Sequence, residues 1–368
     1  MSPYRNDIFS KSGTLSLAKV WSKTCICFIS LLFLLVFTGC AKNKIGTAKK
    51  ETNHGRYGSE FPTRNASDEI EEITRSVKKV YSVSHYTTYQ FRQEAKITGY
   101  QIQNGTYKKA AWGVISTNET VFGTATVIGF SNSQVALLTC AHIVNSPDTL
   151  INYFEPAGEN PTRYIQRFSV KEKQENWVKD ISSCGSFQIL AIDIPNDIAI
   201  LGKKCEILTD TVVPFSYPSG RAKELTWGSF VYIFGYPMGG MVVTRGIVSP
   251  AAKRPMGEFS VDALLNKGFS GGIIVALRDG VPNFELVGMV ITVNSSREEF
   301  LKPASGQPHT PDWFPYKGEM FVGKSDNIQY GLNAVVPFES IIDFYKTHRQ
   351  DVIANGYNLD GFFLEGNK

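Results

Sequence analysis

The sequence predicts an all-β fold with one short helix near the amino terminus and a second helix close to the carboxyl end. From residue 84 onward, residues that favour strands occur in short runs, and glycine, asparagine and proline interrupt these runs. Helices are expected only at residues 68–80, where Ile70, Ile73, Val77 and Val80 recur at spacings of three and four, and at residues 338–347. The apolar content of 42% over 368 residues is enough for a sizeable core.

The amino-terminal residues 1–39 are predicted to be an export signal. Their apolar run, residues 26–38, is shorter than the ~20 residues that span a bilayer, and basic residues precede it. Phe37-Thr38-Gly39-Cys40 resembles a bacterial lipobox, which implies a lipid on Cys40, and Ala41 after it favours the outer membrane. A membrane anchor that is never cleaved is the alternative.

The charge distribution gives no reason to expect nucleic acid as a partner. The formal net charge is +4, and the signal segment holds four basic residues against one acidic residue. The remainder therefore carries 34 basic and 33 acidic residues, which is close to balance.

The chain after the signal divides by composition into four stretches. Residues 40–66 are polar and without periodicity, as in a flexible tether. Residues 67–107 are expected to form an extension with a helix and strands, 108–348 the main domain, and 349–368 a tail. Two long polar insertions are expected within the main domain, at residues 153–184 and 294–328.

Three short fragments supply the residue types of nucleophilic catalysis. His142 ends the apolar run Leu138-Thr139-Cys140-Ala141-His142, Asp197 begins Asp-Ile-Ala-Ile-Leu, and Ser270 lies in Gly-Phe-Ser-Gly-Gly. A serine needs a neighbouring base to take its proton, and histidine suits that task because its pKa lies near neutrality. A carboxylate beside the imidazole fixes its tautomer and stabilises the imidazolium. The sequence thus predicts His142 as base, Asp197 as orienting group and Ser270 as nucleophile.

The glycines around Ser270 have their own physical reason. An oxyanion hole needs backbone N–H groups aimed at one point, and glycine permits the unusual dihedral angles of such a tight loop. The backbone N–H groups of Gly268 and Ser270 are the expected donors, while Gly271 and Gly272 leave room for the substrate backbone and the imidazole.

Several motifs in this order resemble the chymotrypsin-fold serine proteases, closest to their HtrA/Deg-like trypsin branch, over roughly residues 110–346. The motifs are Thr124–Ile128 with Leu137–His142, Phe234–Gly239 with Val243–Ser249, Asp262–Ser270, Leu286–Val290 and Gly331–Pro337. The resemblance implies two six-stranded Greek-key barrels with the triad in the cleft between them. It departs from the HtrA pattern after residue 348, where too few residues follow for a PDZ module.

The resemblance also raises two questions about specificity and activation. Phe269 stands where trypsin carries an aspartate that receives a new amino terminus, so a trypsin-style zymogen step is not supported. Phe269 either seats the loop by packing or leaves the oxyanion loop unformed until something binds. By analogy Leu264 forms the floor of the substrate pocket and Ile291 and Val293 its wall, which implies small or medium apolar P1 residues.

Cysteine and histidine usage leaves one question open and points to no metal. Beyond Cys40, the exported chain would hold Cys140, Cys184 and Cys205, and an odd count leaves at least one thiol unpaired within the chain. A disulfide between Cys184 and Cys205 is one possibility that the sequence leaves open, and Cys140 is interpreted as a small buried apolar residue. Neither His85 nor His309 has a paired ligand spacing, so no metal site and no cofactor are expected.

The function hypothesis that follows is a serine endopeptidase of the cell envelope, with protein or peptide substrates. Two other classes remain as alternatives: a catalytically inactive binding protein that uses the same fold, and a membrane-bound scaffold or chaperone. Reaction of Ser270 with a fluorophosphonate probe separates the enzyme from both.

Overall fold

The computed structural model describes residues 55–154, 164–206, 212–249, 259–303 and 320–365. Residues 54–368 form one compact unit. The predicted signal segment and Cys40 lie outside the described residues. Within the described residues, no helix combines the length and apolar character that crossing a membrane requires.

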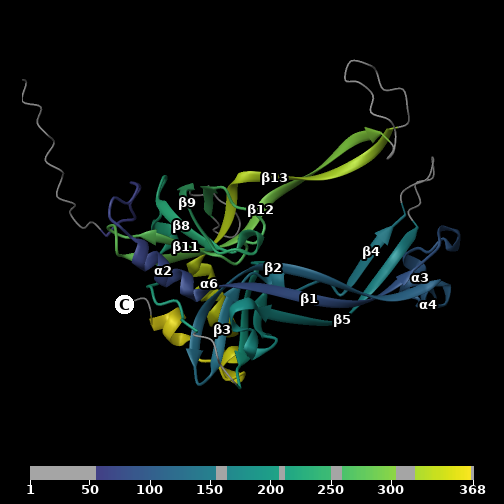
Figure 1. Ribbon diagram of the computed structural model, residues 1–368, viewed down its shortest axis with the longest axis horizontal. Coiled ribbons are helices and arrows are strands. Elements are labelled where there is room, and N and C mark those ends of the chain that lie inside the picture. Colours follow the sequence, from purple (N-terminus) through teal and green to yellow (C-terminus); the bar gives the residue numbers. More distant parts are fainter. Residues whose placement is uncertain (1–54, 155–163, 207–211, 250–258, 304–319, 366–368) are drawn as a thin grey trace, which may run out of the picture. The chain divides into compact units, whose positions relative to one another are not determined.

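The first half of this unit is a seven-stranded antiparallel sheet (Figure 1). Its strands, in spatial order, are β4 (Thr149–Tyr153), β5 (Ile165–Val178), β1 (Val77–Gln90), β2 (Gly113–Ser131), β3 (Gln134–Thr139), β7 (Ile198–Lys204) and β6 (Gln188–Asp193).

The second half is a closed six-stranded antiparallel barrel. Its strands follow one another around the barrel as β10 (Phe259–Ala263), β13 (Met320–Pro337), β12 (Phe284–Pro303), β11 (Ile273–Leu277), β8 (Phe230–Gly235) and β9 (Val242–Ser249). The predicted all-β class with two barrel-like sheets is confirmed. The first sheet differs from the expected six strands because it holds seven.

The two predicted helices are present, with different ends. Helix α2 spans Ser67–Ser76, and the residues expected to continue it begin strand β1 instead. Val77 and Val80 are fully buried there, and β-branched side chains fit a pleated surface better than a helix. Helix α6 spans Phe338–Ala354 and is longer than predicted. The shorter helices are α3 (Gly99–Gln103), α4 (Tyr107–Ala110) and α5 (Ala141–Val144).

The predicted boundary between an extension and the main domain is not a structural boundary. Strand β1 pairs with β2 along its whole length and with β5 from Val80 to Gln90, so it lies inside the first sheet. Strand β5 occupies residues 165–178 of the insertion expected at residues 153–184. The described part of the insertion at 294–328 continues β12 and β13 as a long hairpin (Figure 1).

The last residues also pack on the domain instead of forming a tail. Tyr357, Leu359 and Phe363 are buried in the large core cluster. Asp360 accepts hydrogen bonds from Arg349 and from Tyr345 of helix α6, the latter at 2.8 Å.

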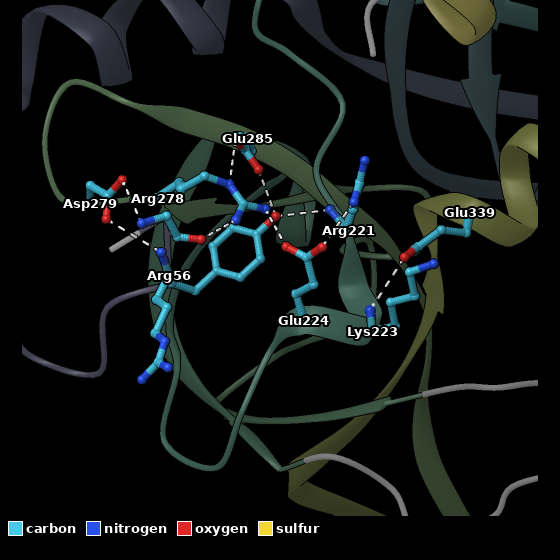
Figure 2. A network of polar contacts seen from close by, with 10 residues as sticks. Arg56, Arg221, Lys223, Glu224, Arg278, Asp279, Glu285 and Glu339 are labelled. Carbon is cyan, nitrogen blue, oxygen red and sulfur yellow. Dashed lines mark hydrogen bonds and ion pairs between the residues drawn. The ribbon is translucent and has the colours of Figure 1, made fainter. Parts of the chain in front are cut away.

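Residues 55–66, which the composition assigned to a flexible tether, are docked on the second barrel. The Tyr57 hydroxyl donates to Glu285 at 2.6 Å, and the Arg278 guanidinium lies 4.3 Å from the centre of the Tyr57 ring. The backbone N–H groups of Gly55 and Arg56 donate to the carboxylate of Asp279. Figure 2 shows Arg278, Asp279 and Glu285 of the second barrel beside the segment that carries Arg56.

Cys184 and Cys205 form a disulfide with their Cα atoms 4.6 Å apart. The bond closes the chain around the β6–β7 hairpin, at whose turn Asp197 lies. Cys140 is a free, buried thiol.

Candidate active site

His142 is presented by the short helix α5, directly after strand β3. Its neighbours Ala141, Ile143 and Val144 are buried, whereas 45% of the His142 side chain is exposed. Burial of these three apolar side chains fixes the helical turn, and the imidazole therefore faces out of the first sheet.

Asp197 lies at the turn between β6 and β7 and holds His142 at two points. One carboxylate oxygen is 2.7 Å from the ring Nδ1, and the other accepts the backbone N–H of His142 at 2.8 Å. Asp197 adopts a left-handed conformation (φ 54°), which aspartate tolerates better than most residues. The side chain of Asp193 stabilises this turn because it accepts the backbone N–H of Asn196 at 3.1 Å.

The Ser270 loop requires glycine at two positions. Gly268 has φ 106°, and a Cβ atom there would lie 2.5 Å from the carbonyl oxygen of Tyr236. Gly271 has φ 82°, and a Cβ atom there would lie 2.0 Å from the carbonyl oxygen of Thr124. A side chain would therefore displace the loop from Tyr236 at position 268 and from strand β2 at position 271.

Thr124, a fully buried residue of β2, anchors the loop on both sides of Phe269. Its hydroxyl donates to the carbonyl oxygen of Gly268 at 2.7 Å and accepts the backbone N–H of Tyr236 at 2.9 Å. Its backbone N–H donates to the carbonyl oxygen of Ser270 at 2.8 Å. Thr139 then donates its hydroxyl to the Thr124 carbonyl at 2.7 Å, which links the loop to the strand that leads to His142.

These contacts leave two backbone donors available at the loop. The carbonyls of Gly268 and Ser270 are occupied by Thr124, while the N–H of Phe269 donates to Asn266 and that of Gly271 to Val290. Among the described residues, no hydrogen bond engages the N–H of Gly268 or of Ser270. An oxyanion hole requires two free donors on a fixed loop, and the N–H groups of Gly268 and Ser270, two residues apart, meet this requirement.

Phe269 seats this loop by packing. Its side chain is 2% exposed and belongs to the core of the second barrel, where Gly235 makes room for the ring. Of the two alternatives that the sequence left open, the structure has the packed one, with the loop already formed.

The Ser270 hydroxyl makes no hydrogen bond to the His142 ring within the described part of the chain. Catalytic hydrogen bonds in ligand-free structures are often long and shorten when substrate binds. The elements that carry the two residues are linked by the Thr124–Thr139 hydrogen bond and by Cys140, whose thiol donates to the Val290 carbonyl at 3.3 Å.

Cys140 belongs to the surroundings of the His142–Asp197 pair. Burial raises the pKa of its thiol well above the usual value, so the group is a neutral packing residue. Ligand atoms of Cys140, His142 and Asp197 lie within 4.8 Å of one another. The carboxylate and Nδ1 already bond each other, and the thiol donates to a carbonyl, so we assign this group to the pair and not to a metal.

The structure corrects one predicted pocket residue. Leu264 is 75% exposed and lies on the surface, while its neighbour Leu265 is fully buried in the second barrel's core. The alternation of side chains along the chain places Leu265 inward and Leu264 outward, so Leu264 does not form a pocket floor. Ile291 is half-buried against the large core cluster. The backbone of Val293 pairs with Asn333, and its side chain is outside the described residues.

Sequence reasoning missed Thr124 and Thr139, which connect the nucleophile loop to the histidine strand. The signal was present as two threonines inside otherwise apolar runs. A buried polar residue in such a run needs a hydrogen-bond partner, but the sequence does not say where that partner lies.

The family comparison agrees with this arrangement. Residues 123–289, somewhat less than half of the chain, match the family model described as the trypsin-like peptidase domain. The matched stretch is similar to this domain in sequence. It contains His142, Asp197 and Ser270.

No curated protein sequence matches the chain. A solved structure titled as the serine endoprotease from Yersinia pestis is similar at 15% identity and a TM-score of 0.34, over 81% of this chain and 69% of that one.

Proposed function

We propose that this protein is a serine endopeptidase that acts through His142, Asp197 and Ser270. The observation that carries the proposal is the two-point contact between Asp197 and His142, together with a formed loop that offers the free N–H groups of Gly268 and Ser270. The trypsin-like peptidase domain over residues 123–289 supports the same reaction class.

Each group has a role in the proposed reaction. Asp197 faces Nδ1 of His142, so the other ring nitrogen is the one that takes the proton of the Ser270 hydroxyl. The Ser270 oxygen then attacks the peptide carbonyl carbon, and the two N–H groups stabilise the oxyanion. The imidazolium gives the proton to the leaving amine, and an acyl-enzyme remains on Ser270. Water then attacks the acyl carbon while His142 takes a proton from it, and His142 returns this proton to the Ser270 oxygen as the acid product leaves.

The finer features of the proposal rest on the sequence. The lipobox-like Phe37–Cys40 supports export and a lipid on Cys40, which would place an HtrA-type protease in the cell envelope, with the outer membrane favoured. A diacylglyceryl cysteine at the mature amino terminus, found by mass spectrometry, tests this. A chain that still begins near Met1 contradicts it.

Apolar P1 specificity is proposed from Ile291 and Val293 alone, since Leu264 lies on the surface.

A fluorophosphonate probe tests the catalytic proposal directly. The wild-type protein should be labelled at Ser270 and should hydrolyse an unfolded protein such as casein. Ser270→Ala should lose both properties while its far-ultraviolet circular dichroism and thermal unfolding stay unchanged. A folded wild-type protein that resists the probe and cleaves nothing would instead favour a binding role for the domain.

A further inference from the structure

One edge of strand β2 is open beside the proposed catalytic serine. Strand β1 pairs with β2 without interruption from Gly113 to Thr126, whereas β3 pairs with β2 only from Ala125 onward. Within the described residues, no strand pairs with the other edge of residues 113–122. Figure 1 shows β1 and β2 extending together beyond the end of β3.

The hydrogen-bonding direction along this edge is fixed by Thr124. Its N–H crosses the open side of β2 to reach the Ser270 carbonyl at 2.8 Å. In a strand, every second residue directs its N–H and C=O to the same side, and the β1–β2 register has no bulge. The residues that present both groups to the open edge are therefore Phe122, Thr120, Asn118, Ser116 and Val114.

This edge lacks the features that usually prevent strand addition. Residues 113–122 contain no proline, lysine or arginine, and Glu119 is their one charged residue. Val114 and Ile115 are 56% and 42% exposed, so apolar side chains are accessible next to the free backbone groups. A ten-residue edge of this kind is suited to pairing with another extended chain.

The edge leads directly into the site. The Phe122 ring lies 3.1 Å from the position that a Cβ of Gly268 would occupy, which places the inner end of the edge against the oxyanion loop. We propose that the open edge of β2 from Val114 to Thr120 binds the part of a polypeptide substrate that follows the scissile bond, as an added antiparallel strand. This inference rests on the proposed function.

The direction follows from strand chemistry. Antiparallel pairing is the more stable arrangement, and β2 runs toward Ser270, so the added chain must run away from Ser270. The paired residues are then on the carboxyl side of the cleaved bond. Measured from Phe122, where β2 meets the oxyanion loop, the open edge reaches about 27 Å to Val114. This length corresponds to about eight substrate residues after the scissile bond. The substrate class is therefore an unfolded or extended polypeptide.

Quenched fluorescent peptides with a fixed sequence before the scissile bond and two, four, six or eight residues after it test this. We expect kcat/KM to rise roughly threefold with each added pair, in keeping with the gain from a backbone hydrogen bond, and to level off near eight. N-methylation of successive residues should lower kcat/KM only at alternate positions. Length-independent cleavage, or N-methyl effects without alternation, overturns the inference.

A pair of protein variants makes the test specific. Ser116→Pro removes one outward N–H, and proline is tolerated on an edge strand, whereas Ser116→Ala keeps that N–H. Ser116→Pro should abolish the gain from the last substrate residues, which reach position 116, and leave the two-residue peptide unaffected, and Ser116→Ala should behave as wild type. Equal behaviour of all three proteins contradicts the proposal.

Two other results separate this inference from the proposed function and from self-association. If no peptide is cleaved, the proposed function fails, and fluorescence anisotropy with the Ser270→Ala protein decides the inference: the eight-residue peptide should bind more tightly than the two-residue peptide. If sedimentation shows a dimer that Ser116→Pro dissociates, a second copy occupies the edge and the substrate proposal is wrong.

Discussion

Asp197 bonds His142 through both carboxylate oxygens, one to the ring Nδ1 at 2.7 Å and one to the backbone N–H at 2.8 Å. The two contacts fix the imidazole in position and in tautomer. Asp197→Asn can place its amide N–H toward the ring, which would favour the tautomer with the proton on the wrong nitrogen. We expect kcat/KM to fall about 10⁴-fold with little change in KM.

The control for this substitution is Asp343→Asn on helix α6, an exposed aspartate in an i,i+3 ion pair with Lys346. It removes the same charge far from the site and should leave kcat/KM unchanged. An Asp197→Asn protein with near wild-type activity would show that another group orients His142.

Thr124 and Thr126 provide a matched pair on one strand. Both are fully buried, but Thr124 bonds Gly268 and Tyr236, whereas the Thr126 hydroxyl has no hydrogen-bond partner within the described residues. Thr124→Val leaves two buried backbone groups unpaired, so it should lower the free energy of unfolding by about 1–3 kcal/mol. It should also lower kcat about 10²-fold, because the loop shifts.

Thr126→Val should keep full activity and equal or slightly higher stability, since it replaces an unpaired hydroxyl with a methyl group. Chemical denaturation and steady-state kinetics on both variants measure these effects. Equal losses in the two variants would mean that the Thr124 hydroxyl has no special role in placing the loop.

The comparison of sequence and structure shows which information is local. His142, Asp197 and Ser270 are predicted from the short motifs that surround each of them, and the all-β class followed from short runs of strand-forming residues. The end of helix α2 was misplaced because Val77 and Val80 have apolar spacing that suits either a helix or a strand. Both side chains are buried in the first sheet, and this burial stabilises the strand.

Non-local contacts could not be predicted. Tyr57 lies in a polar stretch, and its partners Arg278 and Glu285 are more than 220 residues away. The outward direction of Leu264 depends on the register of the loop before Ser270, which the motif spacing does not fix. The open edge of β2 follows from where β3 ends, a property of strand pairing and not of composition.

Specificity for apolar P1 residues is the next prediction. An unpaired buried charge is costly, so a peptide library should show cleavage after Val, Ala, Leu or Ile and not after Lys or Arg. One methylene group of the P1 side chain changes the binding free energy in an apolar pocket by about 1–3 kcal/mol. Cleavage rates should therefore change gradually from one apolar P1 residue to the next. Ile291→Ala should shift it to larger residues, whereas exposed Leu264→Ala should change nothing. Dominant cleavage after Arg or Lys contradicts this.

Arg278 should stabilise the docked amino-terminal segment. It pairs with Glu285 at 2.8 Å and with Glu224 at 2.9 Å (Figure 2). Its guanidinium also lies over the Tyr57 ring. Arg278→Ala should lower the free energy of unfolding by about 2 kcal/mol, because charged hydrogen bonds are lost in a half-buried site. It should also speed amide hydrogen exchange of residues 55–61.

Arg221→Ala is the control for this experiment, since the Arg221 side chain is 61% exposed and its one ion pair within the described residues is with Glu224. Its effect should be below about 1 kcal/mol. Unchanged exchange at residues 55–61 in Arg278→Ala would show that the segment is held by other contacts.

The contact between Asp360 and Arg349 should give a distinct acid dependence of stability. Hydrogen bonds from Arg349 and Tyr345 lower the pKa of Asp360 from 3.8 to about 2. Because the folded-state pKa is lower than the unfolded one, the stabilisation is fully present above about pH 4 and is lost as pH falls through about 2. Asp360→Asn should therefore lower Tm at pH 7, and roughly half of this difference should be gone near pH 3.

Asp351→Asn tests whether this pH dependence belongs to Asp360. Asp351 is 75% exposed on the same helix as Arg349, and its ion-pair partner His348 is 3.8 Å away. The Tm of the Asp351→Asn protein should equal that of the wild-type protein at every pH. If the Tm difference between Asp360→Asn and the wild-type protein stays constant from pH 7 to pH 3, the Asp360 carboxylate does not have a lowered pKa in the folded protein. The segment after helix α6 is then held by the buried side chains of Tyr357, Leu359 and Phe363.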